Sequence, residues 1–118
     1  MSKDKLNVPR KMLVCEVGTC PVTTSLSVMG GKWKASILYA LDQEGTLRFG
    51  ELKRVVVNIT QKMLTSQLRE LEADGLVNRR VYAEVPPRVE YRLTDYGQSV
   101  QPVLRALAKW GSTHMERC

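Results

Sequence analysis

Cys20 directly precedes Pro21, and its thiol is the most reactive side chain that the sequence pattern of this 118-residue chain indicates. Proline favours the first position of a helix, because its missing N–H would have no partner there, so Cys20 is predicted to be the N-cap residue. The unpaired amides and the positive dipole end of a helix stabilise a thiolate and lower the pKa of the thiol. We therefore predict that Cys20 senses redox state; the alternative is an inert, partly buried cysteine at a helix start.

The other two cysteines, Cys15 and Cys118, are candidates for the second sulfur of a disulfide, and the sequence leaves the pairing open. Three cysteines in a chain with no export signal are free thiols by default. A zinc site is disfavoured, because His114 is the single histidine and Cys15 and Cys20 supply two loosely spaced ligands. No metal, no cofactor and no enzymatic activity is predicted, since neither a base nor a histidine partner accompanies Cys20.

A second group of chemically capable side chains, Lys62, Thr65, Ser66 and Arg69, lies between Thr60 and Gly75. Short hydroxyls and long cations are the side chains that bond to the base edges and phosphates of DNA. The net charge of +6 and the pI near 9.5 also favour an acidic partner, either nucleic acid or an anionic membrane surface. The alternative is the solvated face of an ordinary amphipathic helix.

A helix must position this second group. Thr60 is a favourable N-cap residue, and Gly75 tolerates the left-handed conformation that ends many helices. The helix between them is about 20 Å long. Leu64, Leu68 and Leu71 recur at i, i+4 and i+7, so one stripe is apolar and must be buried. The cations and hydroxyls then lie on or near the opposite, outer side.

The rest of the chain predicts a small α+β fold, mainly α. An alternation of period two predicts a hairpin in which Val77, Val81 and Ala83 share a face on one strand and Val89, Tyr91 and Leu93 on the other. Pro102 is predicted to kink or divide the last helix near Gln101. Further helices are predicted from Pro21 to Gly30, Lys32 to Asp42 and Phe49 to Val56, with a short strand at 46–48 and Thr94 capping the last helix.

This order of elements is that of a winged helix-turn-helix, with 49–56 and 60–73 as the two helices of the motif. In that geometry the second helix lies in the major groove and the hairpin reaches the backbone or the minor groove. Four arginines, Arg79, Arg80, Arg88 and Arg92, are concentrated on the hairpin. Arg88, just beyond two prolines, is the best candidate for a phosphate or minor-groove contact; the alternative for each arginine is a solvated or ion-paired side chain.

The chain is predicted to hold a basic N-terminal arm at 1–19 and a single domain at 20–118 that carries the C-terminal helix. One recognition helix and one wing discriminate a genomic site poorly, whereas two copies read half-sites about 34 Å apart. The apolar stripe of the last helix, with Trp110 and Met115 beyond it, is the predicted dimer surface. No apolar run is long enough to span a membrane and no secretory segment is present, so we expect a cytoplasmic protein.

Six collinear runs resemble the HxlR-type family of bacterial winged-helix regulators, and together they cover 20–111. The runs are CPV, GGKWK, LRFGELKR, ITQKMLTSQLRELEADGLV, VPPRVEYRLTDYG and LAKWG. The resemblance implies a homodimeric transcription factor, often a repressor, whose first and last helices build the dimer interface. It also implies that Arg48 and Arg88 match basic positions beside the recognition helix and in the wing, and that the cysteine before the matching proline senses oxidants or electrophiles in several members.

The sequence therefore predicts a regulator that binds double-stranded DNA as a homodimer on a pseudo-palindromic operator, with an oxidant or electrophile as effector. The alternative is a winged-helix domain used for protein contact alone, in which the arginines would be dispensable. The predicted DNA-binding residues are Arg48, Lys62, Thr65, Ser66, Arg69, Arg80 and Arg88.

Overall fold

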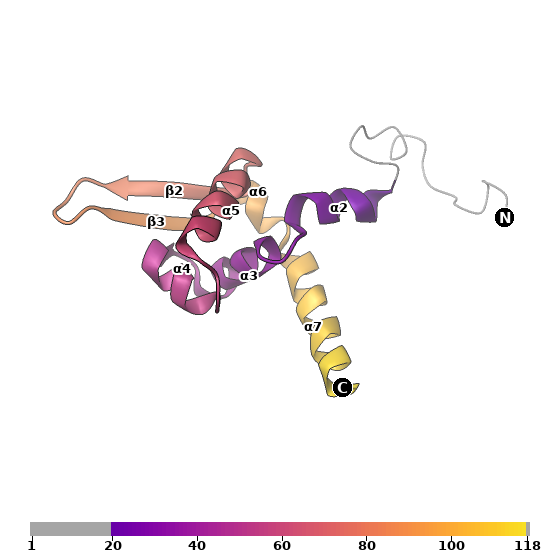
Figure 1. Cartoon of the computed structure of the whole chain (residues 1–118). Coiled ribbons are helices and arrows are strands. Elements are labelled where there is room, and N and C mark those ends of the chain that lie inside the picture. The colour runs from indigo at the N-terminus through magenta and orange to yellow at the C-terminus, as the bar shows by residue number, and fades with distance from the viewer. Residues whose placement is uncertain (1–19, 118) are drawn as a thin grey trace. The chain divides into compact units, whose positions relative to one another are not determined.

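The computed structural model describes residues 20–117, which fall into two compact units with a boundary between Gly31 and Lys32. The predicted basic arm at 1–19 lies outside the described residues. In the first unit, helix α2 (Pro21–Met29) has Cys20 as its N-cap residue, Pro21 in its first turn and Gly30 at its C-cap, as the sequence predicts (Figure 1). Val22 and Leu26, two apolar residues of this helix, are 65% and 57% exposed.

The second unit has the predicted winged helix-turn-helix order. Its three-stranded antiparallel sheet has the order β1-β3-β2, so the short first strand pairs with the far strand of the hairpin. Its elements are α3 (Lys34–Glu44), β1 (Leu47–Arg48), α4 (Phe49–Val55), α5 (Gln61–Ala73), β2 (Val77–Tyr82), β3 (Arg88–Leu93), α6 (Asp95–Gln98) and α7 (Gln101–Arg117).

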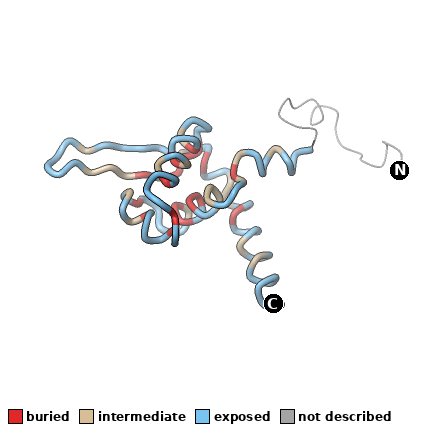
Figure 2. The backbone as a smooth tube through the Cα atoms, viewed as in Figure 1, coloured by how far each residue is buried: buried red, intermediate tan, exposed pale blue. Residues whose placement is uncertain are grey.

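The core of this unit forms where α3, α4 and α5 pack together, which Figure 2 shows as a cluster of buried segments. The predicted stripe of α5 is buried here, with Leu64, Leu68 and Leu71 each at most 1% exposed. Fully burying a leucine side chain contributes about 1.5–3 kcal/mol, so this stripe fixes the rotation of α5 about its axis. The other fully buried side chains are Ile37, Leu38, Leu41, Leu52 and Leu76.

The cap of α5 also forms as predicted. The Thr60 hydroxyl accepts a hydrogen bond of 3.0 Å from the Met63 amide, and Gly75 follows the helix with a φ of 80°. A side chain at Gly75 would be strained at this φ, so the glycine lets the chain turn directly into β2.

The hairpin is only partly buried along the faces that the alternation predicts. Val77 and its partner Leu93 are buried at the base, but Val81 is 54% exposed and Ala83 lies beyond the end of β2. The distal part of the hairpin extends past the helices in Figure 1, which agrees with the exposure of Val81 near the end of β2. Alternation identifies the faces of a strand, whereas burial depends on how far the core extends along it.

Thr94 and Gly97 join the hairpin to the end of α5. Thr94 is predicted to cap the last helix, and it caps α6, the short segment before the division near Pro102. Its hydroxyl accepts from the Gly97 amide at 2.8 Å and donates to the Gly75 carbonyl at 2.5 Å. The Thr94 amide donates to the Leu76 carbonyl at 3.0 Å. This junction therefore connects α5, β2 and α6 directly through main-chain groups.

Helix α7 begins at Gln101, so Pro102 lies in its first turn, and the predicted division from α6 is confirmed. The side chain of Asp42 on α3 is fully buried and holds the start of α7. Its carboxylate accepts from Gln101 Nε2 at 2.6 Å and from two nitrogens of Arg105 at 3.0 and 3.2 Å. The pKa of Asp42 lies below its ordinary value, chiefly because Arg105 donates hydrogen bonds to the carboxylate and stabilises its charge.

We expect Gly97→Ala to lower the free energy of unfolding by about 1–3 kcal/mol, the usual cost of overpacking. A Cβ at position 97 would lie 2.0 Å from the carbonyl oxygen of Leu76, and both groups belong to the backbone. Urea unfolding followed by circular dichroism measures the change. Gly50→Ala on α4 is the control, because its Cβ would meet nothing within 4 Å. Equal unfolding free energies for the two variants would contradict the close-packed junction.

Candidate nucleic-acid interface

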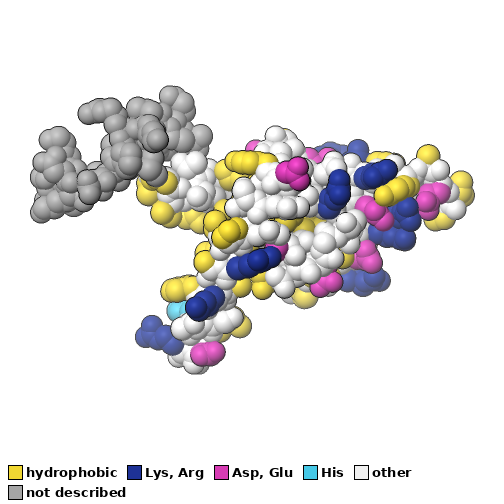
Figure 3. Space-filling model, turned by 180° about the vertical axis from the view of Figure 1, so that it is seen from behind, with side chains coloured by type: hydrophobic (Ala, Val, Ile, Leu, Met, Phe, Trp, Pro, Cys, Tyr) yellow, Lys and Arg dark blue, Asp and Glu magenta, His cyan; other side chains and the backbone are white. Residues whose placement is uncertain are grey.

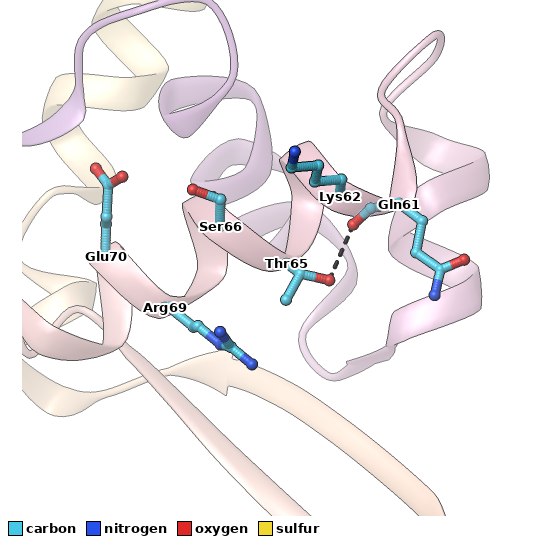
Figure 4. A pocket seen from close by; sticks show the side chains of 6 residues that line it. All are labelled: Gln61, Lys62, Thr65, Ser66, Arg69 and Glu70. Atoms are coloured by element: carbon cyan, nitrogen blue, oxygen red, sulfur yellow. Dashed lines mark hydrogen bonds between the residues drawn. The ribbon is translucent and has the colours of Figure 1, made fainter.

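The outer face of α5 is a shallow hollow, and its side chains lie in two rows (Figure 4). Lys62, Ser66 and Glu70 point to one side of the helix, whereas Thr65 and Arg69 point to the other. Residues four apart lie on the same face of a helix, which gives each row its spacing. The structure thus brings together the four residues of α5 that the sequence singled out, with Gln61 and Glu70 completing the lining.

Lys62, Ser66 and Arg69 are exposed, and within the described residues no hydrogen bond or ion pair engages their side chains. Thr65 differs, because its side chain is half-buried and its hydroxyl donates to the Gln61 carbonyl at 2.9 Å. The Thr65 oxygen keeps only its acceptor capacity for an outside donor. Two cations and one free hydroxyl are therefore available on this face for phosphates or base edges.

Glu70 and Lys34 are residues of this interface that the sequence analysis did not single out. Lys34 Nζ, at the start of α3, lies 2.6 Å from Glu70 Oε1 on α5. The Lys34 side chain is 12% exposed and that of Glu70 is 53% exposed. Periodicity within α5 places Glu70 on the outer face, but no spacing rule connects it to a lysine on another helix.

The arginines of the hairpin are more engaged than their sequence positions suggest. Arg80 and Arg88 both lie over the ring of Tyr82, with guanidinium carbons 5.1 and 3.9 Å from its centroid. Arg88 also pairs with Glu84 and Glu90, each at 3.5 Å. The Arg88–Glu90 contact is an ion pair without hydrogen-bond geometry, since the buried Nε of Arg88 has no hydrogen-bond partner. The positive charge of Arg88 is therefore already balanced by carboxylates.

Charges of both signs alternate along the hairpin, as Figure 3 shows on the face opposite to that of Figure 1. Arg79 pairs with Glu72 of α5 at 3.8 Å. Arg48 is exposed at the N-cap of α4, where its amide donates to Glu51 Oε1 at 2.8 Å. Arg48 and Arg88 line one hollow with the two prolines of the loop, so the structure brings these two predicted residues together.

Cys20, in the first unit, is exposed and free. The pKa of its thiol is lowered, because the backbone amides of Thr23 and, to a smaller extent, Val22 lie near the sulfur and stabilise its negative charge, although the side chain makes no capping hydrogen bond. The local environment therefore matches the predicted helix N-cap. Cys15 and Cys118, the two predicted partners, lie outside the described residues.

Within residues 20–117, no three side chains of the His, Cys, Asp or Glu types are grouped as a metal site would require. No helix in the same range combines the length and the apolar character needed to span a membrane.

Helix α4, the turn after it, helix α5 and the β2–β3 hairpin define a winged helix-turn-helix protein of the transcription-regulator class. The chain belongs to the HxlR-like helix-turn-helix family, whose model matches residues 28–118. This membership confirms the resemblance in the sequence.

Similar proteins support the same class. The chain is 56% identical over 96 residues to the HTH-type transcriptional regulator YtcD of Bacillus subtilis strain 168, covering 81% of this chain and 75% of YtcD. The structure of the redox regulator HypR in its oxidized form is 50% identical, with a TM-score of 0.75 over 80% of this chain and 96% of HypR. The reduced form of the transcriptional regulator YodB from B. subtilis is 33% identical, with a TM-score of 0.70 over 86% and 99% of the two chains.

We expect the thiolate of Cys20 to form at a lower pH in the folded protein than in the unfolded chain, because unfolding removes the helix-start amides from beside the sulfur. Iodoacetamide labelling across a pH series, with Cys15 and Cys118 replaced by serine, gives the midpoint of thiolate formation. The same variant in concentrated urea is the control. A folded midpoint equal to or above the urea midpoint would show that the N-cap does not activate this thiol.

Proposed function

We propose that this protein is a repressor that binds a pseudo-palindromic operator as a homodimer, with α5 of each copy in the major groove. The observation that carries this proposal is the division of α5 into two faces. Its leucine stripe is buried, while Lys62, Ser66 and Arg69 are exposed and have no hydrogen-bond or ion-pair partner among residues 20–117. In the helix-turn-helix class, such a face contacts phosphates and base edges.

The apolar surface of α7 supports the homodimer. Leu107, Trp110 and Met115 are 47%, 68% and 74% exposed, although Leu104 on the same helix is buried. Leu107 and Met115 also line a groove with Tyr39 of α3. Contiguous exposed apolar surface of this kind marks a protein contact, and a twofold contact places two copies of α5 for two half-sites.

Thiol oxidation is the proposed signal. Cys20 is exposed with a lowered pKa, and the similar protein HypR is described as a redox regulator. Hydrogen peroxide oxidises two thiols to a disulfide and is itself reduced to two molecules of water: a thiolate attacks one peroxide oxygen and becomes a sulfenic acid as the first water leaves, and the second thiol displaces the second water from that sulfur. We propose Cys20 as the attacking thiolate and Cys15 or Cys118 as its partner. A disulfide across the dimer would change the angle between the two α5 helices, and thereby their fit to the half-sites.

Lys62→Ala tests the DNA-binding face. We expect weaker binding to the intergenic DNA beside the protein's own gene, and a slope of log K against log salt reduced by about 1, because one phosphate contact is lost. Fluorescence anisotropy across a salt series measures both quantities. Lys109→Ala on α7 is the matched control, since it removes the same charge from an exposed position on another helix.

If the Lys62 and Lys109 variants bound equally, the docking of α5 would be wrong. If the unsubstituted protein did not bind duplex DNA at any salt concentration, the domain would serve protein contact instead. Arg88→Ala is also expected to weaken binding, but it additionally removes the contacts to Tyr82 and Glu84 and therefore tests the wing as a whole.

Cys20→Ser tests the sensor. We expect the variant to bind operator DNA as tightly as the unsubstituted protein and to keep that affinity after treatment with hydrogen peroxide or diamide. The unsubstituted protein is expected to change its affinity on the same treatment and to recover it with dithiothreitol. Band-shift titrations before and after treatment measure the difference. An oxidant response that persists in Cys20→Ser would remove this thiol from the mechanism.

A further inference from the structure

Glu70 is an unexpected residue on the proposed DNA-binding face of α5. Its side chain points in the same direction as those of Lys62 and Ser66 and completes their row (Figure 4). A carboxylate that faces the DNA backbone repels the phosphates and cancels part of the attraction of a neighbouring cation. A positive charge close to Glu70 is therefore needed to compensate this carboxylate.

Lys34 supplies the compensating charge from a different helix. Its ammonium lies 2.6 Å from Glu70 Oε1, and its side chain is only 12% exposed, whereas Glu70 is 53% exposed. The lysine is thus placed beneath the interface rather than on it. Because little of Lys34 is accessible, a direct bond to a phosphate is disfavoured, and its charge acts on DNA through the carboxylate that it holds.

We propose that Lys34 is a positioning residue for operator binding, which neutralises Glu70 and holds its carboxylate against α3. With Glu70 neutralised, Lys62 carries the net positive charge of this row on α5, and Ser66 offers a free hydroxyl. This inference rests on the proposed function, since it assigns a role within the same DNA-binding face. It also assigns Glu70 no part in base recognition.

Two other roles for these residues make different predictions. If Glu70 accepted a hydrogen bond from the N4 amine of a cytosine, its replacement would weaken binding whatever stood at position 34. If Lys34 bound a phosphate directly, its replacement would weaken binding even without the carboxylate. Net charge separates these cases, because removing both charges restores the neutral pair.

The experiment compares Lys34→Met, Glu70→Gln and the double variant with the unsubstituted protein, using the same intergenic duplex. We expect Lys34→Met to bind roughly three- to tenfold more weakly at low salt, as one uncompensated charge near a phosphate would cause. Glu70→Gln is expected to bind at least as tightly as the unsubstituted protein. The double variant is expected to bind within about twofold of the unsubstituted protein, since its pair again carries no net charge.

Salt and stability separate this role from a structural one. The deficit of Lys34→Met is expected to shrink as salt rises, because ions screen the exposed Glu70 carboxylate, whereas a misfolded helix would bind poorly at every salt concentration. Lys34→Arg keeps the charge and is expected to keep the affinity. Thermal unfolding confirms that each variant is folded; if Lys34→Met is not, Lys34→Gln takes its place in the series.

A double variant as weak as Lys34→Met, or a Glu70→Gln variant weaker than the unsubstituted protein, would overturn the proposal. Failure of the proposed function is distinguishable in the same titrations, because the unsubstituted protein would then not bind the duplex at all.

Discussion

The burial of the leucine stripe on α5 is the constraint on which the rest of the structure depends. Leu64, Leu68 and Leu71 are almost inaccessible to solvent, and rotating the helix would expose all three. At about 1.5–3 kcal/mol for each leucine, such a rotation would cost as much as many small domains have in total stability. The outward direction of Lys62, Ser66 and Arg69 is therefore determined by the hydrophobic core and not by those side chains.

Local rules predicted the elements, and non-local contacts account for what they missed. Thr60, Thr94 and Gly75 have the predicted roles, because caps and helix ends depend on neighbouring residues in the chain. The exposure of Val81 was not predictable, since it depends on where the helices stop covering the hairpin. The pairing of Lys34 with Glu70 joins separate helices, so it follows only from their packing.

The hairpin illustrates why counting charges in a sequence overstates a binding surface. Four arginines there suggested a strongly cationic wing, yet Arg88 and Arg79 are paired with glutamates, and Arg80 and Arg88 also lie over Tyr82. These contacts stabilise the conformation of the hairpin, and they reduce its long-range attraction for phosphates. Any phosphate that approaches Arg88 must compete with Glu84 and Glu90. Lys62 and Arg69 on α5 have no ion-pair partner among residues 20–117. They therefore supply a larger share of the positive charge that can reach a phosphate than the number of arginines on the hairpin implies.

Helix α3 relates the proposed DNA-binding face to the proposed dimer surface. Toward α5 it contributes Lys34 to the pair with Glu70, and toward α7 it contributes the buried Asp42 side chain, which binds Gln101 and the exposed Arg105. Between these two polar contacts it buries Ile37, Leu38 and Leu41 in the core. Because closely packed interiors deform little, the direction of α7 and that of α5 are both set by α3. In a twofold dimer built on α7, the separation of the two recognition helices then follows from the geometry of α3, and a change in the angle of α7 against it would alter that separation.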